Sequence, residues 1–142
     1  MSHAERHTER HTERDLEILA LNQAMLESVM QGDWQAYSAV CCPSISCFEA
    51  DAKGHLVEGL AFHQFYFPSQ PANQEEGSDS AKVTVTMASP HLRWLSDHAV
   101  VLSYTRLVQR YSHGEAVTTS CNETRIWQQL DGSWKQVHMH RS

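Results

Sequence analysis

Arginines in the C-terminal part of the chain are the residues best placed for chemistry. Residues 15–142 carry 14 acidic and 8 basic side chains, and four of the eight bases, Arg106, Arg110, Arg125 and Arg141, fall in the last three predicted strands. An arginine on a partly apolar sheet face costs free energy unless an anion or a hydrogen-bonding group meets it. Guanidinium groups pair bidentately with carboxylates. We therefore expect the sheet to carry a cationic site whose arginines meet an anion or a hydrogen-bonding group.

A β-hairpin must position two of these arginines. Two alternating runs, 122–127 and 134–141, flank the pair Asp131-Gly132, which is a strong hairpin signal. Simple alternation predicts three groups that each share a face: Cys121, Glu123, Arg125 and Trp127 on the first strand; Lys135, Val137, Met139 and Arg141 on one side of the second strand; and Trp134, Gln136, His138 and His140 on its other side.

Composition indicates one globular domain. The chain has 142 residues, 41% hydrophobic and 20% charged, which suits a single core. The net charge of −6 argues against a nucleic-acid partner. No apolar run approaches the roughly 20 residues of a membrane helix, and the polar N-terminus does not resemble a signal peptide. The cysteines form no CxxC pair, so reduced thiols and a cytoplasmic location are expected.

Metal sites and cofactors are not expected. Residues 1–14 contain the repeat His-Thr-Glu-Arg and no large apolar residue except the initial Met1, so we interpret them as a polar extension. His3, His7 and His11 would line one helical face and could bind a metal, but an exposed tail is the favoured reading. His138 and His140 share a strand face without an evident third ligand.

Helical patterns come first along the chain. Ile18, Leu21, Met25 and Val29 recur at helical spacing from Asp15 onward. A second helix is predicted over 34–40, a strand over 45–49, an extended pair at 56–57 and a short aromatic helix over 60–67. A polar, acidic surface loop is expected over 68–80.

Strands follow the helices. Runs at 81–95, 99–112 and 115–129 precede the last strand, with short turns between them. This order predicts an α+β fold, with the helices packed on one face of an antiparallel meander. Strands this long must bend or bulge. A long helix closing such a curved sheet would make a cone with an internal pocket.

Several motifs carry a family resemblance over 15–142: GDWQAY at 32–37, FEA at 48–50, LVEGLAFHQFYF at 56–67, NETRIW at 122–127 and VHMHRS at 137–142. They look like the association (hub) domain of calcium/calmodulin-dependent protein kinase II, of the nuclear transport factor 2-like superfamily. The resemblance implies a cone-shaped fold and a homo-oligomerisation module, built from dimers across the sheets and closed into two-tiered rings. The kinase's Gly-rich loop and His-Arg-Asp motif are missing from this sequence.

The resemblance also implies a ligand site. Arg106, Arg125 and Arg141 match positions that line the family's interior pocket, and His63 matches the pocket histidine; small carboxylates bind there in the family. The sequence departs from the family pattern at two places. Asn122 replaces an acid, and the 68–80 loop has no aromatic residue, which puts loop gating of the pocket in doubt. An alternative is that internal acids such as Glu123 or Glu49 satisfy the arginines as structural ion pairs.

Enzymes of the same superfamily provide the alternative function. Isomerases and dehydratases place an acid or histidine base deep in the cone, and Glu123 with His63 could form such a pair. Several cations around one pocket would lower the carboxyl pKa and make it a poor base. A non-catalytic oligomerisation module with a carboxylate pocket is therefore the preferred prediction.

Overall fold

A long helix on a curved sheet organises the molecule. The computed structural model describes residues 11–49, 52–67 and 83–142. Helix α2 (Glu13–Gln31) begins at a capping box, in which the Thr12 hydroxyl accepts the Asp15 N–H and the Asp15 carboxylate accepts the Thr12 N–H. It ends where Gly32 adopts φ 70°, a left-handed conformation that favours glycine. The helix therefore starts two residues before the apolar pattern predicts.

Short elements connect the helix to the sheet. Helix α3 (Trp34–Ala39) starts at Asp33, whose carboxylate accepts the Ala36 N–H, and leads into β1 (Cys41–Phe48). β1 begins four residues earlier than expected. β2 (Val57–Glu58) pairs with it, and the aromatic segment forms a 3-10 helix, η2 (Leu60–Tyr66). The predicted 68–80 loop and residues 1–10, which include the first copy of the N-terminal repeat, lie outside the described residues.

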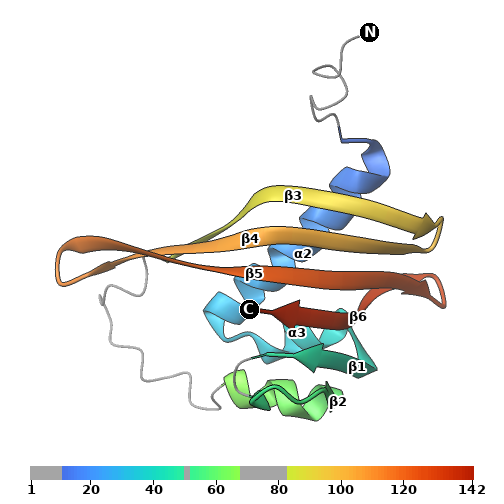
Figure 1. Cartoon of the computed structure of the whole chain (residues 1–142), viewed down its shortest axis with the longest axis horizontal. Coiled ribbons are helices and arrows are strands. Elements are labelled where there is room, and N and C mark those ends of the chain that lie inside the picture. The colour runs from blue at the N-terminus through green and yellow to red at the C-terminus, as the bar shows by residue number, and fades with distance from the viewer. Residues whose placement is uncertain (1–10, 50–51, 68–82) are drawn as a thin grey trace, which may run out of the picture.

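Four long strands complete the sheet. They are β3 (Thr84–Ser96), β4 (Ala99–Ser112), β5 (Glu115–Leu130) and β6 (Ser133–Arg141). The order is β2-β1-β6-β5-β4-β3, antiparallel except for the β1–β6 pair (Figure 1). The turns His113-Gly114 and Asp131-Gly132 have positive φ at both residues, as tight hairpins require. The hairpin predictions are thus confirmed.

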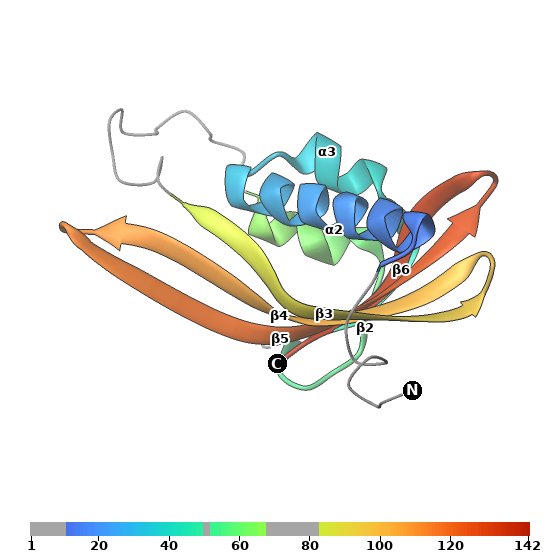
Figure 2. The same cartoon turned by 90° about the horizontal axis from the view of Figure 1, so that it is seen from above.

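The sheet is strongly curved, and α2, α3 and η2 all lie on its concave side (Figure 2). The core between these layers includes Ile18, Met25, Leu26, Leu102 and Trp127, each at most 2% exposed. The α+β architecture expected from the sequence, with a long helix packed on a strongly curved and mostly antiparallel sheet, is confirmed. Among the described residues, no helix is long and apolar enough to cross a membrane.

One prediction about β6 is wrong. Ile126 pairs with His138 whereas Trp127 pairs with Gln136, so Val137 is an extra residue in a β-bulge. The bulge reverses the alternation beyond it. Gln136 and Met139, which simple alternation put on opposite faces, are both buried on the concave side.

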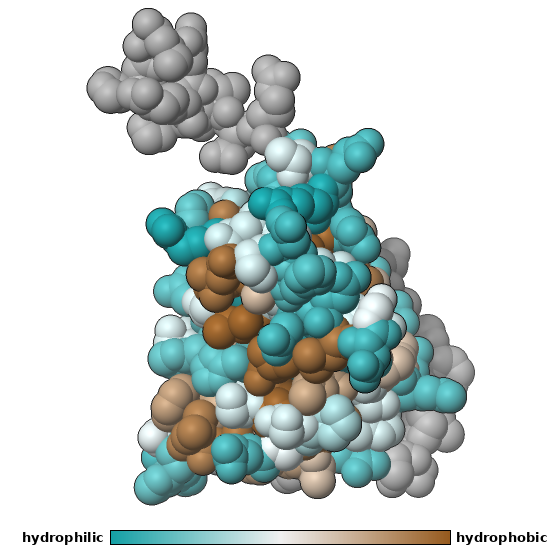
Figure 3. Space-filling model, turned by 90° about the vertical axis from the view of Figure 1, so that its right-hand side faces the viewer, coloured by the Kyte–Doolittle hydropathy of each residue, from teal (hydrophilic) through white to brown (hydrophobic). Residues whose placement is uncertain are grey.

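One end of the sheet exposes apolar surface. Arg14 lies over the Trp94 ring, 4.0 Å from its centroid, and the Trp94 indole N–H donates to Asp15 at 2.7 Å. Trp94 in turn packs edge-on against Trp134. Figure 3 views this end of the molecule and shows apolar side chains gathered among polar ones. The contacts of Arg14 and Asp15 with Trp94 attach the start of α2 to β3.

Candidate functional site

Glu123 lies at the centre of a buried charged cluster on the concave side of the sheet. Its carboxylate is fully buried and contacts all three arginines singled out by the sequence. Arg125 approaches Oε1 at 3.0 Å, while Arg141 and Arg106 approach Oε2 at 3.1 and 3.4 Å. The alternation of β4, β5 and β6 places these side chains together, since Arg106 pairs with Cys121 and Arg141 with Glu123.

Arg125 has partners for each of its nitrogen atoms. It is 1% exposed, and its Nε donates to the Tyr104 hydroxyl and to Glu123, both at 3.1 Å. Its NH1 donates to Gln136 Oε1 at 2.8 Å, and its NH2 donates to Glu123. The Gln136 contact exists because the bulge turns that side chain inward. Arg125 is therefore held as a structural ion pair.

Charge dominates the titration of this cluster. Burial alone would raise the pKa of Glu123, but Arg125 and then Arg141 outweigh it, so the pKa is lowered to about 2. Burial alone would lower the pKa of Arg125, but the Glu123 carboxylate raises it well above its usual value. Glu123 therefore stays ionised, and it is a poor general base.

Arg106 and Arg141 keep donor capacity. Their side chains are 18% and 25% exposed, and Arg141 NH1 also reaches Glu49 at 3.5 Å. Arg106 Nε is buried without a hydrogen-bond acceptor among the described residues. Three guanidinium groups thus face the two carboxyl groups of Glu123 and Glu49. The internal-acid alternative is present in the structure, and it leaves part of the cationic capacity unused.

His63, which matches the family's pocket histidine, lies buried in η2. It is 2% exposed, and its Nδ1 is 2.7 Å from the Tyr37 hydroxyl. Within the described part of the chain, its Nε2 has no hydrogen-bond partner. Burial, with Arg125 and Arg141 nearby, lowers its pKa to about 4. His63 is therefore neutral at pH 7 and can donate or accept one further hydrogen bond.

Asn22 on α2 is a site residue that sequence reasoning missed. It is fully buried; its amide donates to the Tyr104 hydroxyl at 3.0 Å and accepts the Trp127 indole N–H at 3.0 Å. The Tyr104 hydroxyl in turn donates to Glu123 at 2.5 Å. The available signal was a polar residue at helical spacing between Ile18 and Met25. Asn22 connects the helix to the charged cluster.

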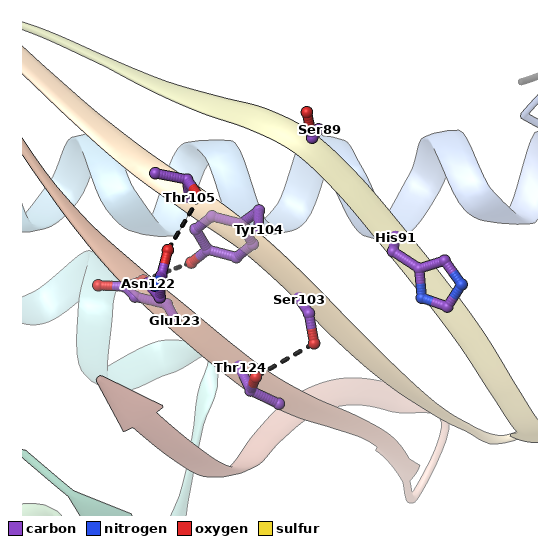
Figure 4. Close-up of a pocket in the computed structure, with 8 residues that line it drawn as sticks. All are labelled: Ser89, His91, Ser103, Tyr104, Thr105, Asn122, Glu123 and Thr124. Atoms are coloured by element: carbon purple, nitrogen blue, oxygen red, sulfur yellow. Dashed lines mark hydrogen bonds between the residues drawn. The ribbon is translucent and has the colours of Figure 1, made fainter. Parts of the chain in front are cut away.

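A separate groove lies on the opposite, convex side of the sheet. It encloses about 290 Å³ and includes Ser103, Thr105, Asn122 and Thr124 (Figure 4). The Ser103 and Thr124 hydroxyls are 3.1 Å apart, and Thr105 donates to Asn122 at 2.9 Å. Tyr104 and Glu123, whose side chains belong to the charged cluster, also line this groove, but none of the described arginines does.

The histidine pair on β6 has local partners. His138 Nδ1 lies 2.7 Å from the Ser46 hydroxyl, and Phe48 packs against the rings of His138 and His140. In the part of the chain that the structure describes, no three His, Cys, Asp or Glu side chains form a group that could hold a metal ion.

Known proteins share this architecture and sequence. Residues 14–142 match the family model described as the calcium/calmodulin dependent protein kinase II association domain. A curated relative, the calcium/calmodulin-dependent protein kinase type II alpha chain of Drosophila melanogaster, is 35% identical over 127 residues. That match covers 89% of this chain but 23% of the fly protein, so the chain spans about a quarter of that relative's length.

Solved structures agree with the family match. The CaMKII hub homology domain of Chlamydomonas reinhardtii is 45% identical with a TM-score of 0.81, covering 92% of this chain and 98% of that one. The association domain of C. elegans CaMKII is 33% identical with a TM-score of 0.78, at 91% and 95% coverage. A putative ketosteroid isomerase at 14% identity and a putative dehydratase at 16% share the fold alone. The chain therefore belongs to the calcium/calmodulin-dependent protein kinase II association domain family.

Proposed function

We propose that this domain is a non-catalytic self-association module whose copies assemble into a large homo-oligomer built from dimers, closed as a two-tiered ring. The observation that carries this proposal is the family match over 14–142, nearly the whole chain. Relatives of up to 45% identity are described as hub or association domains. The four cysteines are free thiols, which supports a reducing, cytoplasmic setting.

Light scattering tests self-association. At micromolar concentration, the particle mass should be many times the 16.2 kDa of the chain. A monomer at that concentration would contradict the proposal. It would favour the alternative, a small-molecule isomerase or dehydratase, although the lowered pKa of Glu123 does not suit proton abstraction.

We further propose that the arginine cluster binds a small carboxylate. Support comes from the unused donors, since Arg106 Nε and His63 Nε2 are buried without partners among the described residues. Among the described residues, three guanidinium groups also surround only two carboxyl groups, which leaves this part of the cluster with more positive than negative charge. Each charge-assisted hydrogen bond contributes roughly 1.5–3 kcal/mol, reduced where the ligand must displace Glu49 or Glu123 from an arginine. Net affinity should therefore be on the order of micromolar to millimolar.

Calorimetry and melting curves with acetate test the carboxylate site. Acetate should bind and should raise the melting temperature by mass action. Arg141→Gln removes a partly exposed member of the cluster and should abolish both effects. Arg110→Gln is the matched control, because Arg110 is an exposed arginine on β4 outside the cluster. Equal acetate binding by wild type and Arg141→Gln, or none by wild type, would reject the site.

A further inference from the structure

Arg141, at the end of β6, meets two acidic side chains. Its Nε donates to Glu123 Oε2 at 3.1 Å, and its NH1 donates to Glu49 Oε1 at 3.5 Å. β1 and β6 lie side by side and run parallel (Figure 1), with Phe48 paired to His140. The residue that follows β1, Glu49, therefore lies next to Arg141. The two acids differ in how many groups of the cluster hold them.

Glu123 is a permanent part of the cluster. Its Oε1 accepts Arg125 Nε at 3.1 Å and Arg125 NH2 at 3.0 Å, and the Tyr104 hydroxyl donates to the same oxygen at 2.5 Å. Arg125 is 1% exposed, so displacing this carboxylate would leave a buried guanidinium without its counter-charge. A ligand that replaced Glu123 would have to satisfy Arg125 as well.

Glu49 is the acid that a ligand can replace. Its 3.5 Å contact with Arg141 is longer than the about 2.7–2.9 Å of a good charge-assisted bond. The Glu49 side chain is 1% exposed, and a long ion pair returns only part of the hydration that a carboxylate loses on burial. The Arg141 side chain is 25% exposed, so a dissolved anion can reach its guanidinium.

We propose that Glu49 is an internal competitor for the carboxylate site. Its carboxylate occupies the place on Arg141 that a ligand carboxylate takes, and a bound ligand displaces it. The inference rests on the proposed carboxylate binding and names what regulates the affinity of that site. Because one anion replaces another on Arg141, the new contact is offset by the contact that is broken. This exchange keeps the affinity modest at a site with three arginines.

The displacement requires only rotation of one side chain. Glu49 lies one residue past the end of β1, and its C=O accepts the Ala52 N–H at 2.9 Å. The backbone would therefore keep its position while the carboxylate leaves Arg141. Hydration of the displaced carboxylate would replace the ion pair that it loses.

Calorimetric titration with acetate tests the competition in two variants. Glu49→Gln keeps the size of the side chain and removes its charge, so acetate should bind about tenfold more tightly than to wild type. Glu49→Asp keeps the charge but is shorter by one methylene group, which breaks a contact that is already 3.5 Å long. Acetate should therefore also bind Glu49→Asp more tightly, by about threefold or more.

Glu58→Gln is the matched control. Glu58 is an exposed acid on the neighbouring strand β2 and lies outside the cluster, and this substitution removes the same charge as Glu49→Gln. Exposed charges are screened by salt and solvent, so its acetate affinity should stay within about twofold of wild type.

Crystal structures of wild type with and without acetate observe the displacement directly and do not depend on a variant that must fold. With acetate, an acetate oxygen should lie within hydrogen-bonding distance of Arg141, and the Glu49 carboxylate should no longer contact that arginine. Glu123 should keep its contacts with Arg125.

The outcomes separate this inference from the carboxylate site itself. Acetate affinity that is unchanged or weaker in both Glu49 variants would overturn the competition and leave the site standing. A gain in Glu49→Gln without a gain in Glu49→Asp would indicate charge repulsion rather than displacement, and would also overturn it, as would acetate bound while Glu49 still contacts Arg141. If neither wild type nor either Glu49 variant binds acetate, both proposals are wrong.

Discussion

Replacing Glu123 with glutamine removes the only carboxylate that contacts all three clustered arginines in the described structure. The side chain keeps its size and loses its charge. Arg125, which is 1% exposed, would retain Tyr104 and Gln136 but lose its ion pair. The buried guanidinium would then lack a neighbouring negative charge at close range.

Two estimates agree on how much Glu123→Gln should lower the free energy of unfolding. Removing one partner of a buried ion pair typically costs about 3–5 kcal/mol. Independently, the pKa of Glu123 falls from 4.5 to about 2 on folding, and each unit corresponds to about 1.4 kcal/mol, which gives about 3 kcal/mol. We therefore expect Glu123→Gln to lower the free energy of unfolding by about 3 kcal/mol at pH 7.

Urea unfolding followed by tryptophan fluorescence measures this change, because Trp127 is fully buried. The protein concentration is held fixed, since self-association couples stability to concentration. Glu115→Gln, an exposed position on the same strand, is the control and should change stability by about 0.5 kcal/mol at most. A loss below about 1 kcal/mol for Glu123→Gln would refute the reasoning, because it would mean that the arginines do not depend on this carboxylate.

The pH dependence provides a second check on Glu123. The folded state binds fewer protons than the unfolded state between pH 4.5 and about 2. Wild type therefore keeps this stabilisation above pH 4.5 and loses it as the pH falls through that window. Glu123→Gln should lack this part of the acid dependence.

Three further perturbations address the surrounding contacts. The pKa of His63 is about 4 in the folded state against 6.5, so unfolding free energy should fall by about 3 kcal/mol as the pH drops from 6.5 to 4; urea unfolding of His63→Gln should show a flatter profile. Asn22→Leu leaves the Trp127 indole N–H without its acceptor and removes a donor to Tyr104. Urea unfolding should therefore show a free energy of unfolding lower by about 1–3 kcal/mol. An unchanged free energy of unfolding would show that the network is dispensable. Thr12→Ala removes the helix cap and should lower the free energy of unfolding by about 1 kcal/mol. Urea unfolding measures this loss, and the control variant Thr84→Ala should leave the free energy of unfolding unchanged.

Local sequence signals predicted most of the architecture. The Asp131-Gly132 turn, the His113-Gly114 turn and the apolar stripe of α2 each depend on residues close together in the chain, so their patterns specify the elements directly. Helix α2 starts earlier than the apolar pattern predicts because Thr12 and Asp15 form a capping box. A pattern of apolar residues contains no information about such a cap.

The site needed the third dimension. Alternation placed Arg125 and Glu123 on one face, but it did not reveal the bulge at Val137 that turns Gln136 inward. Asn22 is distant in sequence from Tyr104, so its role depends on how the helix packs on the sheet. The sequence also left open whether acids or a ligand meet the arginines, because that depends on distances that only the folded structure shows.

Native mass spectrometry of the whole chain tests the central claim most directly. Self-association into an assembly of dimers predicts a dominant species at a large even multiple of the 16.2 kDa chain mass. A spectrum dominated by the 16.2 kDa monomer at micromolar concentration would contradict the account.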